Sequence, residues 1–148
     1  MCSSDLNCDG KDQPAVRRNS EPFFPNPDFE EDYFGERSTK YARSGRHSLF
    51  LAPKASMRCY INFVPETRVT VTAYLRSDDG KALNGSVIVN NHFTRKTYAD
   101  LREVPGGTNG WKKFSATFKN DKDAKIMITF LNRSSADPIY VDDVEVTY

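Results

Sequence analysis

The stretch Val69-Thr70-Val71-Thr72-Ala73-Tyr74-Leu75-Arg76 places a core-forming apolar side chain at every second position. Successive side chains of a β-strand point to opposite faces of the sheet, so this alternation predicts a strand that buries one face. Asp78-Asp79-Gly80 follows at once, and such a run is typical of a turn. We therefore expect a central strand here, with Val71 and Ala73 in the core.

The same period of two recurs along most of the chain. It is found in residues 57–63, 86–91, 111–119 and 125–131, and candidate strands also cover 48–51 and 139–148. No segment carries a helical stripe of apolar residues with caps, and no alternation of strands and helices supports a parallel sheet. Seven or eight short strands in about 125 residues predict an all-β fold, an antiparallel β-sandwich.

The 148 residues are enough for one domain with its own core. Residues 1–21 are polar and lack periodicity, which predicts a flexible tether, and residues 22–148 are expected to form the sandwich domain. The formal net charge of +1 gives no indication of nucleic-acid binding or of attraction to an anionic membrane. No run of residues is long and apolar enough to span a membrane.

The three cysteines, Cys2, Cys8 and Cys59, allow two interpretations. Cys2 precedes a polar tract, which resembles the start of a bacterial lipoprotein whose signal peptide has been removed. Cys2 would then carry a lipid anchor, the protein would be secreted or held at the cell surface, and Cys8 and Cys59 would remain as a candidate disulfide pair. The other interpretation is three free thiols in the cytosol.

Two adjacent carboxylates interrupt the last strand-like run, Ile139-Tyr140-Val141-Asp142-Asp143-Val144-Glu145-Val146. Strands are depleted in Asp and an unpaired buried carboxylate is costly, so one of the two requires a salt bridge, a set of backbone N–H donors or a metal. Apolar residues change from odd to even positions at this pair, which predicts a bulge. If Val144 and Val146 face the interior, Asp142 does so too, whereas Asp143 is expected to be exposed.

Five motifs, in the family's order, resemble those of jelly-roll carbohydrate-binding modules, the group that includes families four, nine and twenty-two. They are Asn26-Pro27-Asp28-Phe29-Glu30, Ser44-Gly45-Arg46-His47-Ser48-Leu49, the strand around residues 67–77, Gly110-Trp111 with the strand that follows, and Tyr140-Val141-Asp142-Asp143-Val144. Together they cover residues 23–148. The resemblance implies a jelly roll, and it is more specific for the fold than for the ligand.

The resemblance also implies a structural calcium ion that joins the first strand to the last. By motif, its ligands would be the side chains of Asp28, Glu30 and Asp142 and the carbonyl oxygen of Arg46. Ca²⁺ accepts this mixture of side-chain and backbone oxygens. Arg43 departs from the pattern, because some relatives offer an acid in that region. The alternative is that Arg43 or Arg46 pairs with Asp142 and no metal binds.

Sugar recognition requires aromatic rings that stack on pyranose C–H faces and planar polar side chains that bond the hydroxyl groups. Side chains of both kinds lie opposite core-facing residues on the expected strands, and we predict that they form one ligand-binding face. They are Tyr60, Asn62, Tyr74, Arg76, Asn90 and His92. Each is equally open to interpretation as an ordinary cross-strand partner on a solvated sheet. The basic and aromatic segment 93–98 is either a contact for an acidic glycan or a solvated loop.

Nothing in the sequence favours catalysis. Its two histidines, His47 and His92, lie in no recognisable nucleophile motif, and no Cys or His cluster has zinc spacing. We therefore predict a non-catalytic, monomeric module that binds a polysaccharide or oligosaccharide on an exported or surface-anchored bacterial protein. It would bind no nucleic acid and would contact a membrane only through a lipid at Cys2. The alternative is a jelly-roll module that binds protein, for adhesion or assembly, and no sugar.

Overall fold

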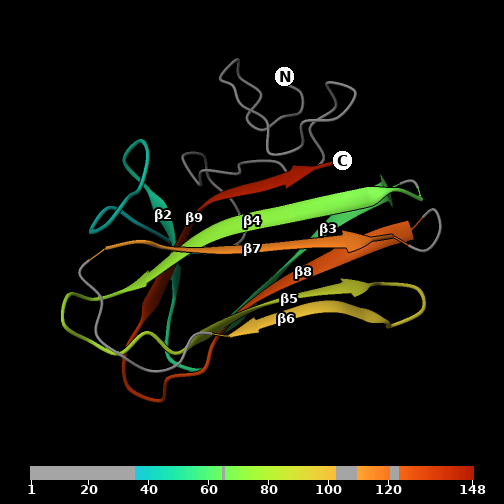
Figure 1. Cartoon of the computed structure of the whole chain (residues 1–148). Coiled ribbons are helices and arrows are strands. Elements are labelled where there is room, and N and C mark those ends of the chain that lie inside the picture. Colours follow the sequence, from blue (N-terminus) through green and yellow to red (C-terminus); the bar gives the residue numbers. More distant parts are fainter. Residues whose placement is uncertain (1–35, 65, 103–109, 121–123) are drawn as a thin grey trace.

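The computed structural model describes residues 36–64, 66–102, 110–120 and 124–148. These residues form nine strands and no helix, and the strands make two antiparallel sheets (Figure 1). The strands are β1 (Glu36–Ser38), β2 (Ser48–Leu51), β3 (Ser56–Val64), β4 (Arg68–Ser77), β5 (Gly85–Asn91), β6 (Thr97–Arg102), β7 (Lys112–Lys119), β8 (Ala124–Asn132) and β9 (Ile139–Thr147). The predicted antiparallel β-sandwich is confirmed, while the expected tether, residues 1–21, lies outside the described residues.

The strand order is β1-β2-β9-β4-β7 in the five-stranded sheet and β3-β8-β5-β6 in the four-stranded sheet. The core lies between the sheets and consists of the apolar positions that the alternation predicts. Val71 and Ala73 on β4 are buried, as are Ile126, Ile128 and Phe130 on β8. Within the described part of the chain, no helix is long and apolar enough to cross a membrane.

Strand β6 was missed by the sequence analysis, which treated residues 93–98 as one loop. Thr97 and Tyr98 belong to β6, and Tyr98 stacks on Phe118 of β7 with ring centroids 4.5 Å apart. The pairing of β5 with β6 shifts register between Val89 and Asn90. This irregularity disturbs the alternation of β6, so its pattern does not have the period of a strand.

The phase change in β9 is a β-bulge, as predicted. Tyr74 pairs with Asp142 and Thr72 with Glu145, so two residues of β9 lie opposite Ala73. Asp143, one of the two, has a positive φ of 50°. Because paired residues share a face, Asp142 lies beside Tyr74 on the outer face of the five-stranded sheet. The prediction that Asp142 faces the interior between the sheets is therefore wrong.

Cys59 is a free thiol on β3, with 2% of its surface exposed. Burial raises the pKa of this thiol to about 12. The protein without reductant is therefore expected to expose one additional reactive thiol when guanidinium unfolds it, because a buried neutral thiol is inert in the native state. Counting thiols with a chromogenic disulfide reagent before and after unfolding tests this. Release of no further thiol would show that Cys59 is bonded, for example to Cys8.

Candidate functional site

The six residues predicted to form one ligand-binding face are divided between the two sheets. Tyr74 and Arg76 lie on β4, in the five-stranded sheet, whereas Tyr60, Asn62 and Asn90 lie on β3 and β5, in the four-stranded sheet. His92 directly follows β5. The outer faces of the two sheets point away from each other, so the prediction of a single face is wrong. Alternation shows which side chains face outward, but it does not show to which sheet a strand belongs.

Tyr74 is covered by the loop that joins β1 to β2, residues 39–47, which we call the β1–β2 loop. The guanidinium carbon of Arg43 lies 3.5 Å from the centroid of the Tyr74 ring. Two contacts hold Arg43 there: its backbone N–H donates to Asp142 over 2.8 Å, and its guanidinium pairs with Asp143 over 2.8 Å. One face of the Tyr74 ring is therefore already in contact with the guanidinium of Arg43.

Arg76 is part of the same packing. Only 7% of its surface is exposed, and its guanidinium carbon lies 3.7 Å from the centroid of the Tyr41 ring. The guanidinium also pairs with Asp79 and donates from Nε to the carbonyl of Ser77 over 3.0 Å. The centroid of the half-buried Trp111 ring lies 5.9 Å from the same carbon. Because of these contacts, little of the Arg76 guanidinium is accessible to a ligand.

Asp142 is fully buried, with 0% of its surface exposed. One oxygen accepts the backbone N–H groups of Arg43 (2.8 Å) and Ser44 (3.3 Å), and the other accepts that of Asp143 (2.8 Å). Of the three alternatives that the sequence leaves open, the structure therefore contains the set of backbone donors. Arg43 pairs with Asp143 and not with Asp142, and this pairing leaves Asp143 only partly exposed.

Burial, followed by the negative charge of Asp143, raises the pKa of Asp142 from 3.8 to about 8, against the effect of the three N–H donors. An elevated pKa is typical of a buried carboxylate without a compensating cation. The described residues fit the implied calcium site only in part, because they contain no group of three acidic, His or Cys side chains that could hold a metal ion. Asp28 and Glu30 lie outside the described residues, so the ion stays a prediction.

A second group of aromatic residues lies on the four-stranded sheet. Tyr60 and Phe93 are 38% and 68% exposed, and within the described residues no other large hydrophobic side chains are exposed. His92 links them, with its ring centroid 5.2 Å from that of Tyr60 and 5.9 Å from that of Phe93. The ammonium of Lys125 lies 4.8 Å from the Tyr60 centroid. We call Tyr60, His92, Phe93 and Lys125 the Tyr60 cluster.

Strand pairing explains how this cluster forms. Tyr60 pairs with Met127 of β8, which pairs with Asn90 of β5, so these three residues lie in one row across the outer face. The backbone N–H of His92 donates to the carbonyl of Lys125 over 2.7 Å and extends the β5–β8 pairing by one residue. Tyr60, Asn90 and His92, which the sequence pattern predicted to share a face, therefore do lie together. The strand pairing adds Lys125, which the sequence pattern did not single out.

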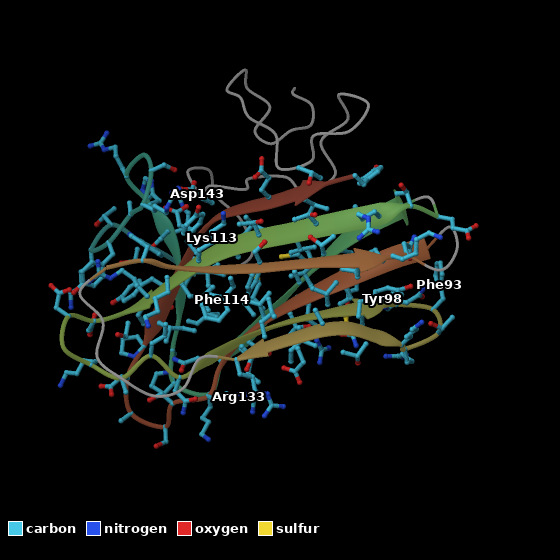
Figure 2. All side chains as sticks on the ribbon, viewed as in Figure 1. Phe93, Tyr98, Lys113, Phe114, Arg133 and Asp143 are labelled. Carbon is cyan, nitrogen blue, oxygen red and sulfur yellow. The ribbon has the colours of Figure 1, made fainter. Side chains whose placement is uncertain are left out.

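The turn after β5 is rigidly built, which positions Phe93. The side-chain oxygen of Asn91 accepts the backbone N–H groups of Phe93 (2.9 Å) and Thr94 (3.0 Å). Figure 2 shows Phe93 at the tip of the β5–β6 hairpin, away from Asp143 and the five-stranded face. The Nδ1 atom of His92 is buried without a hydrogen-bond partner, a condition that native structures rarely leave unexplained.

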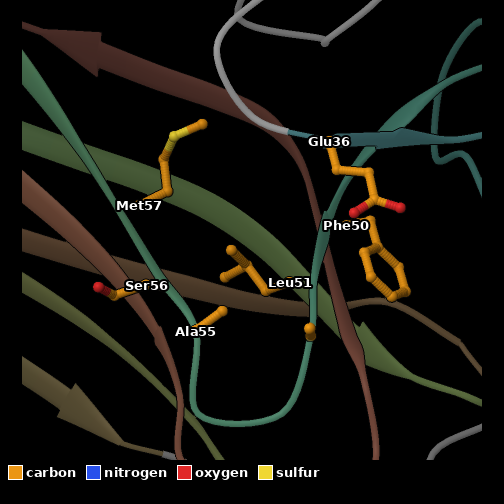
Figure 3. A pocket seen from close by; sticks show the side chains of 7 residues that line it. Glu36, Phe50, Leu51, Ala55, Ser56 and Met57 are labelled. Carbon is orange, nitrogen blue, oxygen red and sulfur yellow. The ribbon is translucent and has the colours of Figure 1, made fainter.

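A pocket of about 310 Å³ lies elsewhere, between the end of β2 and the start of β3 and beside the start of β1 (Figure 3). Its lining consists of Glu36, Phe50, Leu51, Ala52, Ala55, Ser56 and Met57. None of the predicted ligand-binding residues reaches it. The pocket adjoins Glu36, the first described residue, and nothing in the structure shows what covers it, so we assign it no ligand.

No family model and no curated protein matches the sequence. The fold, however, is similar to solved carbohydrate-binding modules. The module TmCBM61, in complex with β-1,4-galactotriose, is 15% identical with a TM-score of 0.62, and the match covers 84% of this chain and 96% of that one. The structure named Family 16 Carbohydrate Binding Module-2 is 13% identical, with a TM-score of 0.60, and the match covers 84% of this chain and 90% of that one.

The C-terminal family 22 module of Clostridium thermocellum Xyn10B is also similar, at 14% identity and a TM-score of 0.57, with coverage of 75% and 78%. The resemblance to jelly-roll carbohydrate-binding modules that the sequence motifs indicate is thus confirmed at the level of the fold. At such low identity the likeness does not transfer a ligand to this chain.

The raised pKa of Asp142 predicts the pH dependence of stability in the absence of divalent cations. A carboxyl whose pKa is higher in the folded state (about 8) than in the unfolded state (3.8) stabilises the fold fully below pH 3.8 and loses that contribution as the pH rises towards 8. The slope is at most about 1.4 kcal/mol per pH unit. Urea unfolding in chelator at several pH values measures the pH dependence of the free energy of unfolding for the wild type and for Asp142→Asn. The variant should lack the part of that dependence that comes from Asp142. A wild type that instead gains stability over this range, relative to the variant, contradicts the prediction.

Proposed function

We propose that this chain is a non-catalytic glycan-binding module whose ligand lies on the outer face of the four-stranded sheet, across the Tyr60 cluster. The observation that carries the proposal is that Tyr60 and Phe93 are both exposed and that both rings contact His92, which lies between them. Exposed aromatic rings stack on the apolar faces of sugars, and exposed large apolar groups that gather in one place usually mark an interaction site.

Polar side chains beside the rings support the proposal. Asn90 lies in the row of Tyr60, and its amide nitrogen donates to Thr97 over 3.0 Å, which fixes the amide plane and leaves the carbonyl oxygen for a sugar hydroxyl. Asn62 is on the same strand as Tyr60, but its side chain lies outside the description. Modules of the same fold include one bound to galactotriose and one named a xylan-binding domain, which supports a saccharide ligand.

The outer face of the five-stranded sheet is a weaker candidate. Beyond the β1–β2 loop it carries hydroxyl pairs, Thr70 with Thr117 (2.9 Å) and Thr72 with Ser115 (3.3 Å), and the exposed Lys113. A face of Thr and Lys fits the alternative, a module that binds protein, better than it fits a sugar-binding module. It contains no exposed large aromatic ring among its described residues, and we therefore favour the four-stranded sheet for a sugar.

The proposal extends to the setting of the module. An exported or surface-anchored protein would present it to a polysaccharide, as a monomer, with Cys2 as a lipid anchor. Calcium would complete the site around Asp142, where Asp28, Glu30 and the Arg46 carbonyl would supply the other oxygens. What supports the ion is a buried carboxylate whose charge the structure does not fully compensate.

Tyr60→Ala is expected to lower the affinity for the best-bound member of a polysaccharide panel by about tenfold, or about 1.4 kcal/mol. Its stability should change by less than about 1 kcal/mol, because the residue is exposed. The matched control is Tyr74→Ala, which should retain the affinity but lose stability with the Arg43 contact. Affinity electrophoresis and urea unfolding measure the two effects. Loss of affinity in Tyr74→Ala alone would place the site on the other sheet.

Millimolar Ca²⁺ is expected to raise the melting temperature relative to chelator, because an ion that binds only the folded state stabilises it, by about 2.7 kcal/mol at 100 times its Kd. Asp142→Asn and Asp28→Asn should each reduce the shift, and Mg²⁺ should not replace Ca²⁺. An identical melting temperature with and without Ca²⁺ would exclude the site. A shift that both variants retain in full would place the ion elsewhere.

A further inference from the structure

Among the described residues, a cation lies over a tyrosine ring on the outer face of a sheet in two places. Arg43 lies over Tyr74 on the five-stranded sheet, and Lys125 lies over Tyr60 on the four-stranded sheet. Arg43 is neutralised by its ion pair with Asp143. Lys125 forms no ion pair with any described residue, although its ring partner is the more exposed of the two tyrosines.

Other exposed cations belong to the strand that carries Tyr60 and to the turn that carries Phe93. Arg58 lies two residues before Tyr60 on β3, so the two side chains share the outer face, and Arg58 is exposed. Arg95 and Lys96 are exposed in the turn that also carries Phe93. Arg95, like Arg58, forms no ion pair with a described residue. The overall net charge of +1 conceals this local excess of positive charge.

Acidic groups of the same region are already engaged. The four strands of this sheet contain one acidic residue, Asp100, and both of its oxygens accept hydrogen bonds from Arg102, over 3.1 and 3.2 Å. Glu66, in the turn after β3, lies 3.8 Å from Lys119. The described acids therefore do not neutralise Arg58 or Lys125.

We propose that the Tyr60 cluster selects acidic polysaccharides, whose sugars carry carboxylate or sulfate groups. This proposal rests on the proposed glycan-binding function. The sugar ring stacks against Tyr60, and its acid group pairs with the ammonium of Lys125. The guanidinium of Arg58, which the strand register places on the other side of Tyr60, pairs with the acid group of a neighbouring sugar. The ammonium is 4.8 Å from the ring centroid, so an acid group on a stacked sugar lies within its reach. Its flexible four-carbon stem allows the small movement that the pairing requires.

Affinity electrophoresis of the full chain tests the proposal with polygalacturonate, dextran sulfate, and the neutral polymers β-1,4-galactan and xylan, at low and high salt. We expect at least one acidic polymer to bind about tenfold more tightly than the neutral ones. Its affinity should fall at high salt, because salt screens exposed charge pairs. The two acidic polymers distinguish carboxylate from sulfate as the recognised group.

Lys125→Gln and Arg58→Gln should each lower the affinity for the acidic polymer several-fold and leave binding to neutral polymers unchanged. Lys113→Gln, an exposed cation on the other sheet, is the matched control and should have no effect. Two results would overturn the selection of acidic polymers and leave the glycan-binding function intact. One is binding that does not depend on salt. The other is equal binding of acidic and neutral polymers, provided that Tyr60→Ala abolishes this binding. Binding to no polymer and to no member of a broad glycan array would overturn both.

Discussion

The acceptance of three backbone N–H groups by the buried Asp142 carboxylate is the interaction on which the arrangement of the five-stranded sheet depends. Two of those groups come from the β1–β2 loop, about a hundred residues away in the sequence. Strand β9 lies between β2 and β4, so a contact on β9 fixes the loop relative to the middle of the sheet. A buried carboxylate left without these donors would be costly, which links folding of the loop to the bulge.

The bulge gives Asp142 and Asp143 different environments. A regular strand would place the two carboxylates on opposite faces, one of them in the apolar core. Instead, the positive φ of Asp143 inserts an extra residue opposite Ala73 and returns Val144 and Val146 to the core. Both carboxylates then meet the β1–β2 loop, Asp142 through backbone donors and Asp143 through Arg43.

The docking of this loop also determines which outward-facing side chains of the five-stranded sheet are used for packing. The loop covers Tyr74 and Arg76 with Arg43 and Tyr41, so the aromatic and cationic side chains of β4 are used for packing. Among the described residues, no loop covers Tyr60 on the four-stranded sheet, and its cation, Lys125, has no acidic partner. The same pair of residue types is therefore anchored by a carboxylate on one face, and no described carboxylate anchors it on the other.

The sequence by itself determined most of the strands, the core and the bulge, because side-chain alternation and its change of phase are local consequences of backbone geometry. It did not predict the short strand β1 or the irregular strand β6. It also identified Tyr60, Asn90 and His92 as outward-facing. Only the tertiary structure decided that Tyr74 and Tyr60 lie on opposite faces, that Lys125 adjoins Tyr60, and that Asp142 is held by backbone donors. Those facts depend on which strands pair and on where a distant loop docks, and no local pattern encodes either.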